Sequence, residues 1–297
     1  MGRFADRLEA LLLLLVIAFG SLGVALPDPG RALDRSGAID PTLAVLVFAT
    51  GLSVDAATLW AVRTRWARLL LALAISTVAL PGLAWAVAQL VSGPPRDGVL
   101  AIGVAPTEVA SVALVGLAGG EVAVAAAFLA VSSVVTVAAA GPVLGLLAHA
   151  PTLHPLALLV NLGLVVALPL GAGSGLRQIA HLGEQSLDSG RLVGSVALLA
   201  LLWEVASQVQ FRPAYAVVVV ALLAFLVGAS GLGWLLTLGL PKPARPGVLL
   251  PVAMRDFAVA AGIAAAAFGP AATGPLGIYG LLVLVFGAGA ARWDAAH

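Results

Sequence analysis

Apolar segments long enough to cross a lipid bilayer recur along almost the whole chain. A membrane-spanning helix needs roughly 20 apolar residues, and the candidate segments are separated by short connections that carry proline, glycine or charge. Because the apolar residues do not alternate with a period of two, a transmembrane barrel is excluded and helices are expected. The ten candidate spans cover residues 11–26, 40–60, 68–92, 98–118, 121–149, 154–176, 191–209, 214–239, 246–268 and 273–291.

Composition supports the same interpretation and excludes several other classes of protein. Of 297 residues, 61% are apolar and 10% are charged, whereas a soluble domain has about 25% charged residues. The absence of cysteine excludes disulfides and thiolate metal sites. A net charge of +1 without a basic cluster gives no sign of nucleic-acid binding, so the expected partner is the lipid bilayer.

The chain is therefore predicted to be one all-α polytopic membrane domain over residues 1–297. Repeat one covers 9–149, a linker covers 150–153, and repeat two covers 154–293. A polar connection at 177–191 is a second candidate for the link between the halves. Two sets of five spans run in opposite directions, as in the inverted repeats of many secondary transporters.

Basic residues in alternate connections predict the orientation, because cytoplasmic loops are enriched in Lys and Arg. The N-terminal side carries ten: Arg3, Arg7, Arg63, Arg65, Arg68, Arg177, Arg191, Lys242, Arg245 and Arg292. The opposite side carries four: Arg31, Arg35, Arg96 and Arg212. Both termini are thus expected in the cytoplasm, with the domain in a bacterial-type inner (plasma) membrane.

The fourth span of each half contains a proline, Pro106 in 98–118 and Pro251 in 246–268. A proline inside a span frees backbone carbonyls, which in hydrocarbon need another partner, and paired interruptions point to a binding site at the midplane. The same two spans hold the clearest intramembrane polar groups. These are Thr107, Glu108, Ser111, Arg255 and Asp256.

Each intramembrane charge costs roughly 2.5 to 3.5 kcal/mol on insertion scales. A Glu108–Arg255 salt bridge that only locks two helices is one interpretation. A functional site is favoured, because two carboxylates and one guanidinium leave a negative charge that needs a proton, a cation or another donor. Asp256 is predicted to face away from Glu108 and to exchange a proton, or alternatively to cap backbone amides freed near Pro251.

Other polar residues inside the spans give weaker signals. Ser76, Ser132 and Ser133 are candidates for the ion or substrate pathway, although such hydroxyls often bond within their own helices. The histidines lie in connections or at the tail, and the sequence contains no HExxH motif. Neither a metal site nor an enzyme is predicted.

Two segments resemble the bile acid:sodium symporter family. APTEVASVALVGLAGGEVAVAAAFLAVSS (105–133) is similar to that family's Gly-Gly-Thr-Ala-Ser-Asn, Leu-Ala-x-Gly-Asp and Ala-Val-Ser-Thr sequence. PVAMRDFAVAAGIAAAAFGPAATGPLGIYG (251–280) is similar to its Glu-x-Gly-Met-Gln-Asn segment and the following Gly-x-x-Tyr-Gly. The resemblance implies a panel of spans 1, 2, 6 and 7, and a core of spans 3, 4, 5, 8, 9 and 10. In that family, spans 4 and 9 cross at the sodium sites and organic anions bind between the two parts.

The departures from that pattern concern the sodium sites. Ser111 keeps its place, but a hard cation needs oxygen ligands, and several positions that supply oxygens in the family are apolar here. These are Val112, Ala125, Leu129 and Pro251. Ser76 replaces a Gln, Arg255 a Gln and Asp256 an Asn, so the usual sodium sites are not expected.

The sequence thus predicts a secondary transporter of a small organic anion. It is expected to use no cofactor and not to be sodium-coupled in the usual way, with a proton as the candidate coupling ion. A non-transporting membrane scaffold or sensor that keeps the fold is the alternative, and a membrane-embedded enzyme is third.

Overall fold

The computed structural model describes residues 2–53, 60, 62, 66–148, 155–180, 182–209 and 214–295, and these are almost entirely helical. Six of the described helices are long and apolar enough to cross a membrane. They are Leu69–Ala88, Val122–Ala148, Leu156–Ala180, Gln185–Ala206, Tyr215–Leu236 and Pro270–Ala291. Three shorter apolar helices accompany them, at Leu14–Ala25, Ile39–Leu52 and Phe257–Phe268.

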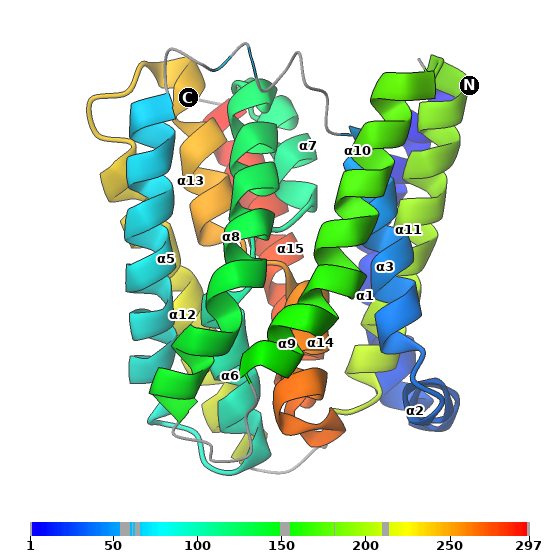
Figure 1. Ribbon diagram of the computed structural model, residues 1–297, viewed down its shortest axis with the longest axis vertical. Helices are drawn as coiled ribbons and strands as arrows, with labels where there is room; N and C mark the ends of the chain where they lie inside the picture. Colours follow the sequence, from blue (N-terminus) through cyan, green and yellow to red (C-terminus); the bar gives the residue numbers. More distant parts are fainter. Residues whose placement is uncertain are drawn as a thin grey trace.

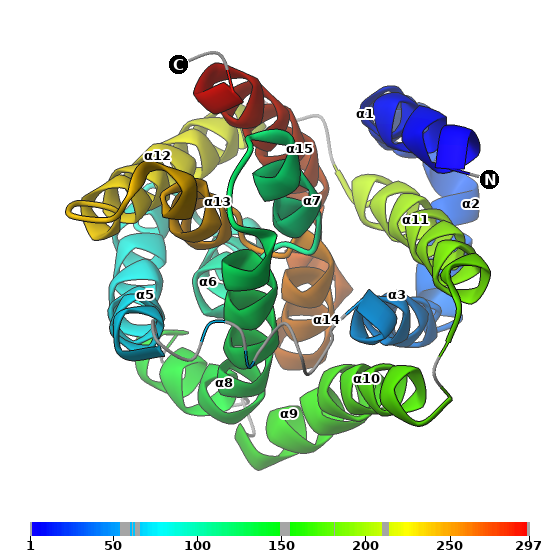
Figure 2. The ribbon, with the colours of Figure 1, turned by 90° about the horizontal axis from the view of Figure 1, so that it is seen from above.

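The helices form two groups that lie side by side (Figures 1 and 2). The panel consists of α1 (Gly2–Ala25), α3 (Ile39–Ser53), α9 (Pro155–Leu162), α10 (Leu168–Ala180) and α11 (Glu184–Ala206). The short helix α2 (Pro27–Arg35) packs against α11 at the lower end in Figure 1.

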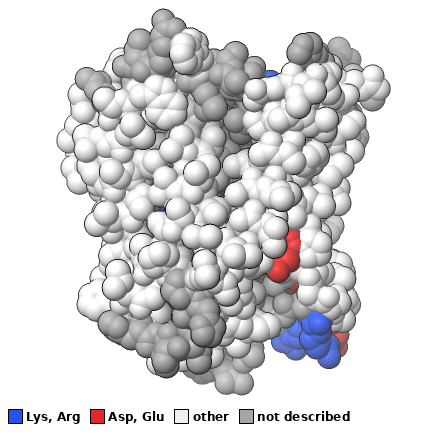
Figure 3. All heavy atoms as spheres, viewed as in Figure 1, with Lys and Arg blue, Asp and Glu red and all other residues white. Residues whose placement is uncertain are grey.

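The other group is the core. It consists of α5 (Trp66–Ala88), α6 (Pro94–Val104), α7 (Ala110–Leu117), α8 (Val122–Ala148), α12 (Ala214–Leu236), α13 (Pro246–Ala253), α14 (Phe257–Phe268) and α15 (Gly274–Ala295). The face of the molecule seen in Figure 3 carries almost no charged side chains. The exceptions are acidic side chains on its right side and, below them, a basic patch over α2, which contains Arg31 and Arg35. An uncharged flank is what a bilayer requires of a surface at hydrocarbon depth.

Two paths through the core are broken near their middle. The first runs upward in Figure 1 through α6 and α7, and the second runs downward through α13 and α14. Pro106 lies in the first break, and Ala105 before it is extended (φ −63°, ψ 155°) because a residue that precedes proline disfavours the helical region. The predicted interruptions are therefore present. The second break lies at 254–256, beyond Pro251, which is itself inside α13.

Some predicted boundaries need correction. The span expected at 154–176 is a helix that contains a π-helical turn at Gly163–Ala167 and continues to Ala180. The polar connection expected at 177–191 is mostly helical, because α10 and α11 occupy its two ends. The predicted linker at 150–153 lies outside the described residues.

Glycines bring two panel helices, α3 and α10, into direct backbone contact. A Cβ on Gly173 would collide with the Phe48 carbonyl oxygen, and one on Gly51 would collide with the Leu170 carbonyl oxygen. Arg177 of α10 also donates to the Leu52 carbonyl oxygen over 2.9 Å. The panel is thereby held as one unit.

We expect Gly173→Ala to destabilise the protein by about 1–3 kcal/mol, because an added methyl group forces two packed backbones apart. Gly171 lies in the same helix with no atom within 4 Å of an added Cβ, so Gly171→Ala is the matched control. It should leave the melting temperature unchanged or raise it, since alanine favours helix more than glycine does. Equal melting temperatures for the two variants would contradict close packing of α3 on α10.

Candidate functional site

The two breaks meet and pair as a short antiparallel ribbon. Thr107 lies opposite Arg255 as an isolated β-bridge. Glu108 N–H donates to the Met254 carbonyl oxygen over 2.9 Å, and Asp256 N–H donates to the Pro106 carbonyl oxygen over 2.8 Å. Each break therefore satisfies backbone groups of the other, as required where no water is available.

Side chains satisfy the carbonyls at the ends of α6 and α13. Because Glu108 N–H is used by the ribbon, it is not available to the Val104 carbonyl four residues earlier, and Thr136 of α8 donates to that oxygen over 3.1 Å. Arg255 Nη2 donates to the Ala105 carbonyl oxygen. Thr107 Oγ1 donates to the Pro251 carbonyl oxygen over 2.8 Å.

Residues directly opposite each other in such a ribbon project to the same face, and the next residue along each strand projects to the other face. Thr107 and Arg255 thus share one face, toward α8. Ser132 Oγ of α8 accepts from Thr107 N–H over 3.2 Å. Glu108 and Asp256 share the opposite face, which we call the carboxylate face.

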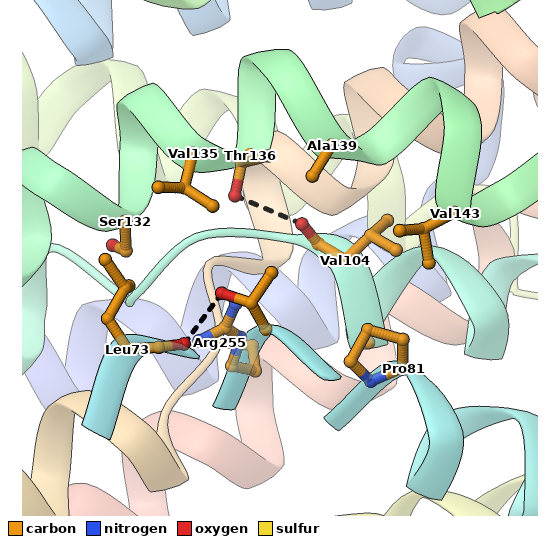
Figure 4. Close-up of a pocket in the computed structure, with 11 residues that line it drawn as sticks. Leu73, Pro81, Val104, Ser132, Val135, Thr136, Ala139, Val143 and Arg255 are labelled. Carbon is orange, nitrogen blue, oxygen red and sulfur yellow. Dashed lines mark hydrogen bonds between the residues drawn. The ribbon is translucent and has the colours of Figure 1, made fainter. Parts of the chain in front are cut away.

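Arg255 borders a cavity of about 20 Å³ between α5, α6 and α8 (Figure 4). Arg255 is only 4% exposed, and its Nε and Nη1 have no hydrogen-bond partner. The polar residues that line the cavity with it are Thr77, Ser132 and Thr136.

On the carboxylate face, the two acids have different surroundings. Asp256 Oδ1 caps α14 by accepting from the N–H groups of Ala258 and Val259, both over 2.9 Å. Glu108 Oε1 accepts from Ala110 N–H over 3.4 Å, whereas its Oε2 has no partner. Both carboxylates thus lie at helix N-termini, where the helix dipole favours negative charge.

The structure corrects the predicted Glu108–Arg255 salt bridge. Ion pairs in the described part of the chain include Arg96–Asp97 and Arg191–Asp188, and none there joins Glu108 to Arg255. The prediction assumed helical geometry at residue 255, but the backbone there is extended and directs the guanidinium away from the carboxylate face. For Asp256, the structure shows the capping contacts that were the alternative to proton exchange.

The two half-helices that begin at the carboxylate face contact the panel to different extents. The lower half-helix α14 packs against α3, α9 and α11 of the panel, whereas the main contacts of α7 are all with the core helices α8, α13 and α15. At the lower end, Gly277 of α15 lies close enough to α11 that an added Cβ would be 2.7 Å from Ala206 Cα. The panel and core are therefore packed together below the crossing, whereas α7 packs mainly within the core.

The predicted site residues divide into three groups. Thr107, Glu108, Arg255, Asp256 and Ser132 meet at the crossing. Ser111 is buried in the first turn of α7, and its hydroxyl has no partner. Ser76 and Ser133 bond to carbonyls of their own helices, Leu73 and Leu129, and do not line the cavity.

Three residues at the crossing or its cavity were not among the predicted site residues. Of these, Thr77 and Thr136 were expected to bond only within their own helices, which Thr77 does and Thr136 does not. Thr77 lines the cavity, Thr136 bonds α8 to α6, and the Tyr279 hydroxyl accepts from Arg255 N–H over 3.2 Å. Tyr279 offered a usable signal, because it is one of only two tyrosines and lies inside a candidate span. The two threonines gave no such signal, because a sequence does not distinguish a threonine that bonds within its own helix from one that bonds to a neighbouring helix.

Comparison with known protein families identifies the family of the chain. The family model described as the SBF-like CPA transporter family matches residues 9–289. The chain belongs to this family. No curated protein matches the chain. Together with the membrane-length helices, membership of the SBF-like CPA transporter family makes the chain a multi-pass membrane protein of a transporter family.

We expect Thr136→Val to lower stability by about 1–3 kcal/mol, because it leaves the buried Val104 carbonyl without a donor. Thr50→Val is the matched control. Thr50 is also buried, but its hydroxyl bonds only to the Leu46 carbonyl four residues earlier in α3, and that carbonyl lies in a continuous helix. Thermal unfolding in detergent checks the difference, and an equal loss in both variants would contradict the cross-helix role of Thr136.

Proposed function

We propose that this protein is a secondary transporter that couples the movement of a small organic anion to protons exchanged at Glu108, without the family's usual sodium sites. The supporting observation is the carboxylate face at the crossing of two interrupted helices. It carries two buried acids, Glu108 and Asp256, and Glu108 Oε2 has no hydrogen-bond partner.

The same proposal includes ten spans built as two inverted five-helix repeats in a bacterial-type inner membrane with both termini cytoplasmic. The opposite directions of α6–α7 and α13–α14 support the inverted repeat. The packing of α7 mainly within the core supports entry of solute between α7 and the panel from the upper end, where α1 begins and α15 ends (Figure 1).

Glu108 is a better proton carrier than Asp256 in this arrangement. Asp256 uses one oxygen to hold two amides of α14, so a change in its charge would disturb the start of that helix. Glu108 Oε2 is free to accept a proton without breaking a hydrogen bond. The two carboxylates act on each other electrostatically, so a proton on Glu108 relieves repulsion at both.

Protons and an organic anion would then favour each other. An anion that enters between α7 and the panel meets two negative charges, and a proton on Glu108 reduces that repulsion. Sodium has no equivalent role, because Val112, Ala125, Leu129 and Pro251 offer it no side-chain oxygen. We therefore expect symport of anion and proton.

The test uses purified protein in liposomes that contain a pH-sensitive dye. Lactate, pyruvate, succinate and citrate are added in turn, and internal acidification is followed. At least one carboxylate should acidify the lumen at a rate that is unchanged when potassium replaces sodium. A steep sodium dependence would contradict the proposal.

Glu108→Gln should abolish this acidification, while Asp256→Asn should retain part of it, because an amide oxygen still caps α14. Ser133→Ala is the control, since Ser133 bonds only within its own helix. Acidification that survives Glu108→Gln would overturn the role of Glu108. No acidification with any anion, in a folded protein that no anion stabilises, would favour the scaffold alternative.

A further inference from the structure

A second set of unpartnered polar atoms lies on the other face of the crossing, away from the carboxylates. Arg255 Nε and Nη1 have no hydrogen-bond partner, although only 4% of the residue is exposed. The same residue lines the cavity between α5, α6 and α8 (Figure 4). A guanidinium stays charged in proteins, and a buried charge without a counter-charge is costly.

The cavity wall supplies hydroxyl groups but no acid. Thr77 and Ser132 donate to the carbonyls of Leu73 and Leu129, and Thr136 donates to that of Val104. Each hydroxyl hydrogen can rotate from its carbonyl to an anion. No carboxylate is among the residues that line the cavity.

Size restricts the occupant. The volume of about 20 Å³ corresponds to one or two water molecules, which excludes an organic anion. We propose that this cavity binds one small inorganic anion of the size of chloride, held by Nε and Nη1 of Arg255 and by the hydroxyls of Thr77 and Ser132. The organic anion of the proposed function would bind elsewhere, between α7 and the panel.

The anion is linked to the carboxylate face through Arg255. The guanidinium acts electrostatically on Asp256, and Asp256 acts on Glu108. Other ionisable residues in the sequences of the packed elements are Tyr279, Arg292 and Asp294 of α15, Arg96 and Asp97 in the first turn of α6, and Arg68 in that of α5, whereas α8 carries none. A bound anion cancels the positive charge that opposes protonation of the two acids, so anion and proton should bind cooperatively.

The anion site is inferred from the cavity and does not depend on the proposed function. Its linkage to protons does rest on the proposed function. The first experiment measures thermal stability of the purified protein as chloride replaces gluconate at constant ionic strength and pH. The melting temperature should rise and saturate with chloride. Thr77→Val should shift the half-saturating concentration several-fold higher, and Arg255→Gln should abolish the response.

Two controls separate a specific site from general salt effects. Thr50→Val removes an equivalent hydroxyl outside the cavity, and Arg35→Gln removes an exposed guanidinium on α2. Both should respond to chloride as the native protein does. If Arg255→Gln does not fold, Thr77→Val carries the test. The same melting temperature in chloride and gluconate would overturn the proposal and assign the cavity to water.

A second experiment tests the linkage by repeating the chloride titration at an acidic and at a slightly alkaline pH. Half-saturation should occur at a several-fold lower chloride concentration in acid, and Glu108→Gln should remove this dependence while chloride still binds. Chloride binding that is independent of pH would overturn the linkage but leave the anion site intact. Neither result depends on carboxylate-driven acidification in liposomes, so the site and the proposed function fail separately.

Discussion

The need to satisfy backbone groups inside the bilayer governs the centre of this structure. Two helices stop at mid-depth, and each exposed end would be costly in hydrocarbon. The reciprocal bonds from Glu108 to Met254 and from Asp256 to Pro106 join the two breaks to each other. Once the strands are paired in this way, alternation along an extended backbone separates the side chains, with Arg255 on one face and both acids on the other.

Because of this separation, Glu108 and Arg255 form no ion pair, and the three buried charges are stabilised in another way. Glu108 and Asp256 lie at the N-termini of α7 and α14, and Arg255 donates to a carbonyl at the C-terminus of α6. Each charge thus lies at the helix end whose dipole has the opposite sign. The ends of α6, α7, α13 and α14 therefore contribute to the stability of the crossing.

The sequence predicted the interruption of both spans but not its geometry. Pro106 marks the first break, yet Pro81 and Pro142 lie inside the unbroken helices α5 and α8, so proline alone does not locate a break. The broken spans differ in having polar residues within five positions after the proline, Thr107 and Glu108 in one span and Arg255 and Asp256 in the other. The face of the ribbon on which each of these four side chains lies depends on the pairing of Thr107 with Arg255, and no local sequence pattern encodes that long-range pairing.

The same limit applies to the hydroxyl residues. Ser76, Thr77, Ser132 and Thr136 all satisfy their hydrogens with backbone carbonyls, and only packing shows that Thr136 reaches a different helix. Composition and apolar length predicted a helical membrane protein, because those properties follow from the solvent around the chain.

Asymmetric packing of the two half-helices connects this centre to movement. The lower half-helix α14 is packed on the panel, where Gly262 lies against Leu43, whereas the upper half-helix α7 has its main contacts within the core. Both half-helices begin at the ribbon, so a shift of the core that brings α7 onto the panel would carry Glu108 and Asp256 with it. The charges would then change the side from which they are reached without any change in their mutual arrangement. In the proposed transporter, a crossing fixed by backbone hydrogen bonds and moved as one rigid body would be the physical basis for coupling.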